Sequence, residues 1–176
     1  MKQIKKPVIF LLGPTAAGKT EWAINWQNKF QFLEIISVDS VMVYKECNIG
    51  SAKPSNEVLE KYPHRLINHV SVESIFSVAN FYDAAHQLIK DIHHQDKIPL
   101  MVGGSMMYFN LLKNGISSLP SADKNLREKL RQKIADEGVE SLHEDLIKLD
   151  PVAAKQIKPK DSQRIIRAIE IIFSTG

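Results

Sequence analysis

The chain has 176 residues, of which 44% are hydrophobic and 24% charged, with a formal net charge of +3. These values are ordinary for one soluble globular domain, or for one domain plus part of another. No apolar run approaches the roughly 18 residues of a membrane span, so we expect no membrane partner. The basic start leads into a short strand and is not a signal peptide. A single cysteine, Cys47, excludes an internal disulfide framework and favours a cytoplasmic location.

The most specific motif is a phosphate-binding loop that follows a predicted buried strand at Pro7–Leu12. Its residues, Gly13, Pro14, Thr15, Ala16, Ala17, Gly18, Lys19 and Thr20, fit the pattern G-x-x-x-x-G-K-[ST]. Backbone N–H groups of such a loop surround phosphate oxygens, and the following helix adds the positive end of its dipole. Lys19 is expected to reach the terminal phosphates and the Thr20 hydroxyl to hold Mg²⁺. The loop predicts a diphosphate or polyphosphate ligand and leaves open which bond breaks.

Strands and helices are predicted to alternate through the first two thirds of the chain. The strands are Pro7–Leu12, Glu34–Val38, Arg65–His69 and Ile98–Val102, and the helices run from Thr20 to about Phe30, from Ser77 to His94 and from Ser105 to about Lys113. This order predicts a P-loop NTPase-like parallel α/β sheet flanked by helices. The phosphate loop, Asp39 and Gly103-Gly104-Ser105 each follow a strand, so all three are expected beyond its carboxyl end, where ligands bind.

The character of the sequence changes near Leu119–Ser121, after which only helices are predicted. They span Asp123–Glu137, Val139–Leu149 and Asp161–Phe173. We therefore divide the chain into an α/β core over residues 1–118 and a helical insertion subdomain over residues 119–176. Two basic stretches, Arg127–Lys133 and Lys158–Arg167, favour a surface for a phosphate backbone, although solvated helix faces give the same pattern.

Two side chains are candidates for catalysis. Asp39, at a strand end beside the phosphate site, suits either binding Mg²⁺ or taking a proton from a nucleophile. Its alternative role is to cap a turn. Ser105 opens a helix after two glycines, so it suits either contact with a diphosphate or a plain N-cap. The six histidines show no metal-site spacing, and none is assigned a catalytic role.

Several further segments, taken with the loop, narrow the family. They are ISVDS at Ile36–Ser40, VYKECNIGSAKP at Val43–Pro54, HRLIN at His64–Asn68, PLMVGGSMMYF at Pro99–Phe109, LPSAD at Leu119–Asp123, DP at Asp150–Pro151 and DSQRIIRAIEI at Asp161–Ile171. In order and spacing the chain resembles the tRNA dimethylallyltransferase (tRNA isopentenyltransferase) family from about Val8 to Gly176.

The resemblance implies transfer of a dimethylallyl group from dimethylallyl diphosphate to the N6 amine of an adenosine next to the tRNA anticodon. By motif, Gly13 to Thr20 bind the diphosphate with Mg²⁺ at Thr20, and Asp39 and Ser105 lie at the reacting centre. The residues implied to contact the tRNA anticodon stem-loop are Asp39, Ser40, Val41, Met42, Ser105, Arg127, Gln163, Arg164, Ile165, Ile166 and Arg167. We expect a monomer in the cytoplasm.

The sequence departs from the family pattern at five positions and in length. Ala17 and Ser51 replace Ser and Thr, Asn48 and Asn68 replace Asp, and Ser105 replaces Thr. Family members are longer, and the sequence ends within the helical part, so we expect exposed apolar surface.

Three alternatives remain open. An adenylate isopentenyltransferase uses free nucleotide, a small-molecule kinase uses ATP, and an inactive fragment only binds RNA or diphosphate. The basic helices argue against the first, and no adenine-binding or lid element supports the second.

Overall fold

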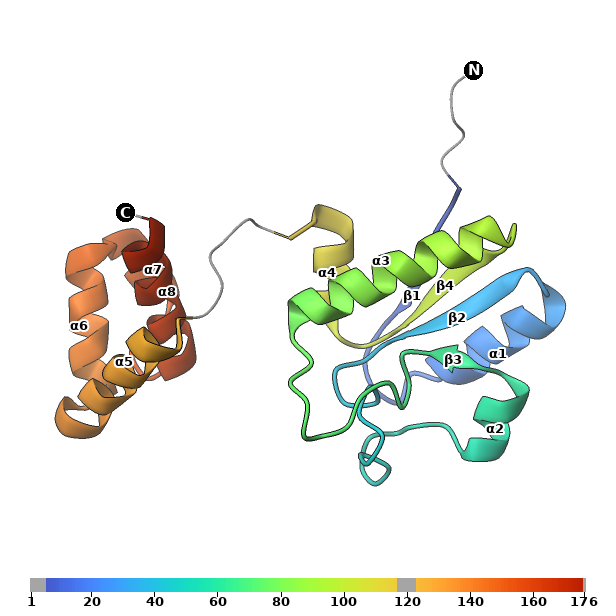
Figure 1. Ribbon diagram of the computed structural model, residues 1–176, viewed down its shortest axis with the longest axis horizontal. Helices are drawn as coiled ribbons and strands as arrows, with labels where there is room; N and C mark the ends of the chain where they lie inside the picture. The colour runs from blue at the N-terminus through green and yellow to red at the C-terminus, as the bar shows by residue number, and fades with distance from the viewer. Residues whose placement is uncertain (1–5, 117–122, 176) are drawn as a thin grey trace, which may run out of the picture. The chain divides into compact units, whose positions relative to one another are not determined.

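The structure, a computed structural model, describes residues 6–116 and 123–175. The chain divides into two compact units, residues 1–116 and 117–176 (Figure 1). The boundary expected between residues 118 and 119 lies outside the described residues. No helix in the described ranges is long and apolar enough to cross a membrane.

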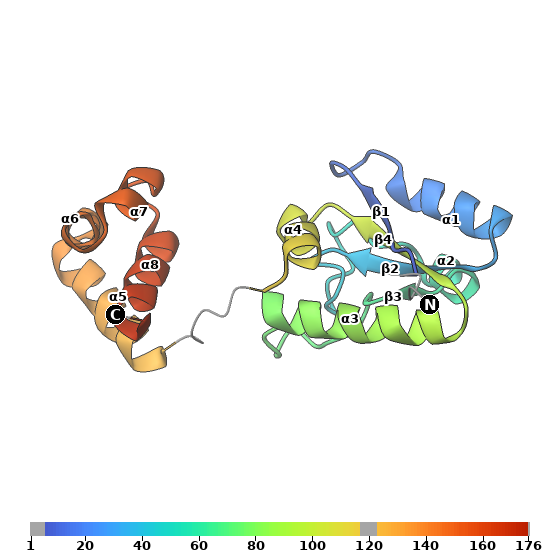
Figure 2. The same ribbon diagram turned by 90° about the horizontal axis from the view of Figure 1, so that it is seen from above.

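The first unit is built on a four-stranded parallel sheet, which confirms the predicted α/β class. Its strands are β1 (Ile9–Leu12), β2 (Leu33–Val38), β3 (His64–Arg65) and β4 (Ile98–Gly103), in the order β1-β4-β2-β3. The helices are α1 (Lys19–Lys29), α2 (Asn56–Lys61), α3 (Val78–His94) and α4 (Met106–Asn114). Helix α1 covers one face of the sheet, and α3 and α4 lie on the other (Figure 2). The central strands β2 and β4 are therefore buried on both sides, as parallel strands usually are.

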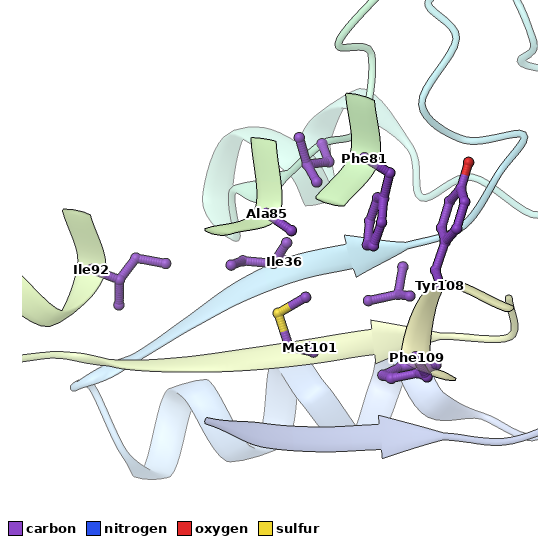
Figure 3. Packing of buried hydrophobic residues seen from close by; sticks show 9 residues of the cluster. Ile36, Phe81, Ala85, Ile92, Met101, Tyr108 and Phe109 are labelled. Carbon is purple, nitrogen blue, oxygen red and sulfur yellow. The ribbon is translucent and has the colours of Figure 1, made fainter. Parts of the chain in front are cut away.

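The core on the α3 side joins the sheet to two helices. Ile36 and Met101 point from β2 and β4 towards Phe81 and Ile92 of α3 (Figure 3). The Phe81 ring stacks on Tyr108 of α4 at a centroid distance of 3.9 Å. Burial of these side chains at about 25 cal/mol per Å² fixes the two helices on the sheet. It thereby fixes the strand ends that carry the candidate site.

Strand β1 is less buried than predicted. Phe10 and Leu12 are 37% and 45% exposed, because β1 is an edge strand that pairs only with β4 among the described residues. Beside them, Met106 and Met107 of α4 are also exposed, and these side chains line an apolar hollow. The expected exposed apolar surface is thus present beside β1.

The segment around β3 differs from the prediction. Only His64 and Arg65 pair with β2, because Leu66 and Asn68 adopt left-handed backbone angles, φ 65° and 53°, that end the strand. The short helix α2 was not predicted. Its N-cap Ser55 accepts a hydrogen bond from the Val58 N–H, and none of its residues is buried, so it lacks the apolar period that sequence analysis detects.

Over residues 123–175 the second unit contains helices and no strand, as predicted. It contains α5 (Lys124–Glu137), α6 (Val139–Leu149), α7 (Pro151–Gln156) and α8 (Ser162–Thr175). Helix α7 was not predicted. It begins at Pro151 because the Asp150 side chain accepts hydrogen bonds from the N–H groups of Val152 and Ala153. Leu130, Leu142, Leu146, Ile165 and Ile169 form the core of this unit.

Candidate active site

The register of the sheet brings three chemistry-bearing segments to one edge. Gly103 of β4 pairs with Leu12 of β1 on one side and with Val38 of β2 on the other. The next residues along the three strands are Gly13, Asp39 and Gly104. Asp39, Gly104 and residues Thr15 to Thr20 of the phosphate loop line a cavity of about 450 Å³, a size that suits a small ligand. The predicted meeting of these segments is therefore confirmed.

The phosphate loop forms one wall of this cavity. Residues Thr15 to Thr20 line it, and the loop is shaped by left-handed backbone at Ala16 (φ 65°) and Gly18 (φ 71°). Helix α1 starts at Lys19, so its dipole points its positive end towards the cavity. The Lys19 ammonium donates to the Pro14 carbonyl oxygen at 2.5 Å, a contact within the loop itself. A bound anion would compete for this ammonium.

Asp39 combines the two roles considered for it. Its Oδ1 accepts hydrogen bonds from the N–H groups of Val41 (2.8 Å) and Met42 (3.0 Å), so it does cap a turn. The same residue lines the cavity together with the phosphate loop, and no described residue donates to Oδ2. One oxygen is thus used to fix the carboxylate, and the other is left for a ligand, a metal ion or a proton.

Ser105 supports the turn that carries Asp39. Its Oγ accepts from the Ser40 N–H at 3.1 Å, and its own N–H donates to the Val38 carbonyl at 3.2 Å. Ser105 is the N-cap residue of α4, yet its side chain makes no capping hydrogen bond, and it does not line the cavity. The hydroxyl therefore joins the ends of β2 and β4. A role at the reacting centre stays a prediction.

Lys53 anchors the loop that forms the opposite wall. Its ammonium donates to the Tyr44 carbonyl (2.8 Å), to Asn48 Oδ1 (2.9 Å) and to Asn68 Oδ1 (2.8 Å). Asn48 and Asn68 are two of the positions that depart from the family pattern. Here each amide keeps the acceptor oxygen that a carboxylate would offer and loses only its charge. At the third departure, the Ser51 hydroxyl donates to the Cys47 carbonyl, and Ser51 lines the cavity.

His64 was not predicted as a site residue. Its Nδ1 lies 2.6 Å from the Tyr62 carbonyl, which only accepts, so Nδ1 carries the hydrogen and Nε2 is an acceptor. Nε2 is buried and has no hydrogen-bond partner among the residues that the structure describes, and the residue lines the cavity. Burial lowers the pKa of the imidazole, which keeps it neutral. The signal for His64 lies in tertiary packing, and no sequence spacing reveals it.

Among the RNA-contacting residues predicted in the helical unit, the charged and polar side chains lie outside its apolar core. Gln163 and Arg164 are exposed, and Arg164 is paired with Asp161. Ile165 is fully buried and Ile166 packs against the same core, so these two side chains support α8 from within. Arg127 and Arg167 are about one third exposed, and both are bonded to the buried carboxylate of Glu170.

Among residues 6–116, the N-terminal unit combines a parallel sheet, a phosphate loop and a carboxylate at a neighbouring strand end. These features define the class of P-loop-like α/β proteins, in which ligands bind beyond the carboxyl ends of the strands. The family model for IPP transferase matches residues 42–176, and the chain belongs to this family.

Curated relatives carry the name tRNA dimethylallyltransferase. The protein from Vesicomyosocius okutanii is 48% identical over 99% of this chain and 57% of its own length. One from Acinetobacter baumannii is 46% identical over 97% of this chain and 54% of its own. The chain therefore spans about half the length of the curated relatives it matches.

Solved structures agree with these relatives. The full-length tRNA isopentenylpyrophosphate transferase from Bacillus halodurans is 38% identical, with a TM-score of 0.61 over 98% of this chain and 57% of that one. A eukaryotic dimethylallyltransferase, described as acting on tRNA, is 29% identical, with a TM-score of 0.76 over 97% of this chain and 44% of that one. The predicted family is thus confirmed.

Proposed function

We propose that this chain supplies the donor site and part of the RNA-binding surface of a tRNA dimethylallyltransferase. The reaction moves a dimethylallyl group from dimethylallyl diphosphate to the N6 amine of an adenosine next to the anticodon. The observation that carries this proposal is the sheet register, which places the phosphate loop and Asp39 around one cavity. The names of the relatives support tRNA and the dimethylallyl group, and the motif resemblance supplies the diphosphate donor and the N6 amine.

The phosphate loop acts on the leaving group. When the allylic carbon–oxygen bond breaks, negative charge grows on the diphosphate. The loop N–H groups and the α1 dipole face that position, and Lys19 exchanges its 2.5 Å contact with Pro14 for a phosphate oxygen. Mg²⁺ fits a place between the Thr20 hydroxyl, whose residue lines the cavity, and the diphosphate, because Mg²⁺ is usually bound by few protein oxygens together with substrate phosphates and water. Bound there, it would further neutralise the diphosphate.

Asp39 acts on the nucleophile. An adenine amine is a poor nucleophile, and a carboxylate that accepts its hydrogen bond and then its proton helps the new carbon–nitrogen bond to form. The Oδ1 hydrogen bonds to Val41 and Met42 hold the carboxylate in place, so Oδ2 is preorganised for this task. Ser105, through Ser40, holds the same turn.

The RNA substrate needs a wider surface than the cavity. The target base must leave its stack, which costs a few kcal/mol, and contacts to the anticodon stem-loop offset that cost. Arg127 of α5 and Gln163, Arg164 and Arg167 of α8, together with the turn at Ser40–Met42, are the proposed contacts. We further propose that the protein works as a monomer in the cytoplasm, where its free Cys47 stays reduced.

The test is the fate of label from dimethylallyl diphosphate. The protein is incubated with the labelled donor and with unmodified tRNA, with AMP or with neither. Label in tRNA supports the proposal. Label in AMP but not in tRNA would favour an adenylate isopentenyltransferase, and transfer of the ATP γ-phosphate would favour a kinase. Binding of both substrates by the 176-residue chain without transfer would identify it as a binding fragment.

A further inference from the structure

A buried carboxylate lies in the middle of the basic helical unit. Glu170 of α8 is 0% exposed. Its Oε1 accepts from the Asp123 backbone N–H at 2.7 Å and from Arg127 Nε at 2.9 Å. Its Oε2 accepts from Arg127 Nη2 at 2.9 Å and from Arg167 Nη1 at 2.7 Å. Four donors therefore meet the two oxygens, which is the full capacity of an ionised carboxylate.

The cluster keeps a net positive charge. Burial raises the pKa of Glu170, but hydrogen bonds from Arg127, Arg167 and Asp123 outweigh this and lower it to about 2. The carboxylate is therefore ionised at neutral pH. One negative charge against two guanidinium groups leaves a charge of +1 on the three side chains.

The two arginines are held in place yet remain accessible. Arg127 makes a two-pronged contact through Nε and Nη2, which fixes both the position and the plane of its guanidinium. The side chains of Arg127 and Arg167 are 33% and 35% exposed, so each presents part of its surface to solvent. They come from different helices and are 40 residues apart in the chain, and Glu170 brings them together.

We propose that Glu170 is a positioning residue that presents Arg127 and Arg167 as a pair to a phosphate of the RNA backbone. The inference rests on the proposed function, because it takes RNA as the ligand. Freezing one long side chain on binding costs roughly a two- to twelvefold loss of affinity. Glu170 removes most of this cost for two arginines at once, since they are already ordered in the unbound protein.

A nearby ion pair provides the comparison. Lys133 of α5 and Asp145 of α6 also join two helices of this unit, and each is about one third exposed. One lysine and one aspartate are neutral overall, so this pair has no net positive charge to attract an RNA phosphate. If Glu170 only fastened helices together, its removal would resemble removal of Asp145 in its effect on RNA binding.

The experiment measures affinity of the 176-residue chain for a fluorescent anticodon stem-loop RNA at fixed ionic strength. The variants are Glu170→Gln, Arg127→Gln and the double variant, with Asp145→Asn as the matched control. Glu170→Met, which refills the buried volume with an apolar side chain, serves if Glu170→Gln unfolds. Circular dichroism at the same temperature gives the folded fraction of each. The Arg127 Nε–H signal in ¹⁵N spectra reports whether its guanidinium is held.

We expect Glu170→Gln and Arg127→Gln each to weaken binding roughly tenfold, and the double variant to fall within about threefold of either, because the two act through one contact. Asp145→Asn should change affinity less than about twofold. The Arg127 Nε–H signal should be protected in the unaltered chain and lost in Glu170→Gln.

Two results would overturn the inference. One is a loss of RNA affinity of about a hundredfold in the double variant, which is the product of the two single losses. The other is an Arg127 Nε–H signal that stays protected in Glu170→Gln. If Glu170→Gln weakens binding to every RNA hairpin equally, and the unaltered chain shows no preference for the tRNA anticodon stem-loop, the proposed function alone would be contradicted. A preference for tRNA with no Glu170 effect would contradict the inference alone. Absence of all RNA binding by the unaltered chain would overturn both.

Discussion

Gly103 should tolerate no side chain, because β2 passes directly beside it. A Cβ at this position would lie 2.0 Å from the Val38 carbonyl oxygen and 2.5 Å from its carbon. These are backbone atoms, so relief requires the paired ends of β2 and β4 to move apart by more than 1 Å, judged against an ordinary contact of about 3.4 Å. Overpacking of this kind costs about 1–3 kcal/mol. Loss of the 3.2 Å Ser105 N–H to Val38 hydrogen bond adds about 1 kcal/mol, so we expect Gly103→Ala to destabilise the α/β unit by about 2–4 kcal/mol.

The neighbouring glycine provides the control. A Cβ at Gly104 would lie 3.4 Å from the Gly13 carbonyl oxygen, so Gly104→Ala should cost less than about 1 kcal/mol. The assay is urea unfolding followed by tryptophan fluorescence, since the two tryptophans of the chain, Trp22 and Trp26, both lie in α1 and report on the α/β unit. Circular dichroism follows the helices of both units, so the helical unit contributes the part of the signal that tryptophan fluorescence does not report, and that part should not move. Equal stabilities of the two variants, within about 0.5 kcal/mol, would refute the close approach of β2 to Gly103.

Three further predictions concern charged and polar groups. Asn68→Asp should give Lys53 an ionic partner and stabilise the α/β unit by up to about 1 kcal/mol at low salt. Urea unfolding measures this gain, and a gain that persists in 1 M salt would contradict an ionic origin. Glu170 has a pKa lowered from 4.5 to about 2, so its contribution of about 3 kcal/mol is present above pH 4.5 and lost as the pH falls towards 2. Glu170→Gln should therefore weaken the helical unit at pH 7 and flatten this acid limb in circular dichroism, and an unchanged limb would show that the carboxylate does not carry it. His64→Leu should change the free energy of unfolding by less than about 1 kcal/mol relative to the unaltered protein, because the lost hydrogen bond to Tyr62 is offset by removal of a buried nitrogen that no described residue bonds. A loss above about 2 kcal/mol in urea unfolding would mean that Nε2 has a partner.

The parts of the fold that depend on local pattern could be predicted from the sequence. The runs that form β2 and β4 are apolar because both faces of those strands are buried, and the loop at Gly13–Thr20 has a spacing set by its own backbone. Asp39 could be found because the carboxyl ends of parallel strands collect at one edge. Each of these depends on neighbours in the chain or on a general rule of topology.

The parts that depend on contacts between distant residues could not be predicted. The extent of β3 is set by left-handed backbone at Leu66 and Asn68; Asn often adopts this conformation, but Leu rarely does, so the residue types alone do not locate the end of the strand. The acceptor role of His64 depends on its burial in the cavity wall. Glu170 lies 43 residues from Arg127, so the sequence showed the cations but not the carboxylate that holds them.

The central claim is that the cavity bounded by the phosphate loop and Asp39 serves dimethylallyl transfer to tRNA. The most direct measurement compares label transfer from dimethylallyl diphosphate to unmodified tRNA by the gene product and by its Asp39→Asn variant, which keeps the Oδ1 hydrogen bonds to Val41 and Met42. We expect the unaltered protein to transfer label to tRNA and the variant to do so at least about a hundredfold more slowly. The variant should still bind dimethylallyl diphosphate, because it lacks only the proton acceptor. Undiminished transfer by Asp39→Asn, or label in AMP and none in tRNA, would contradict it.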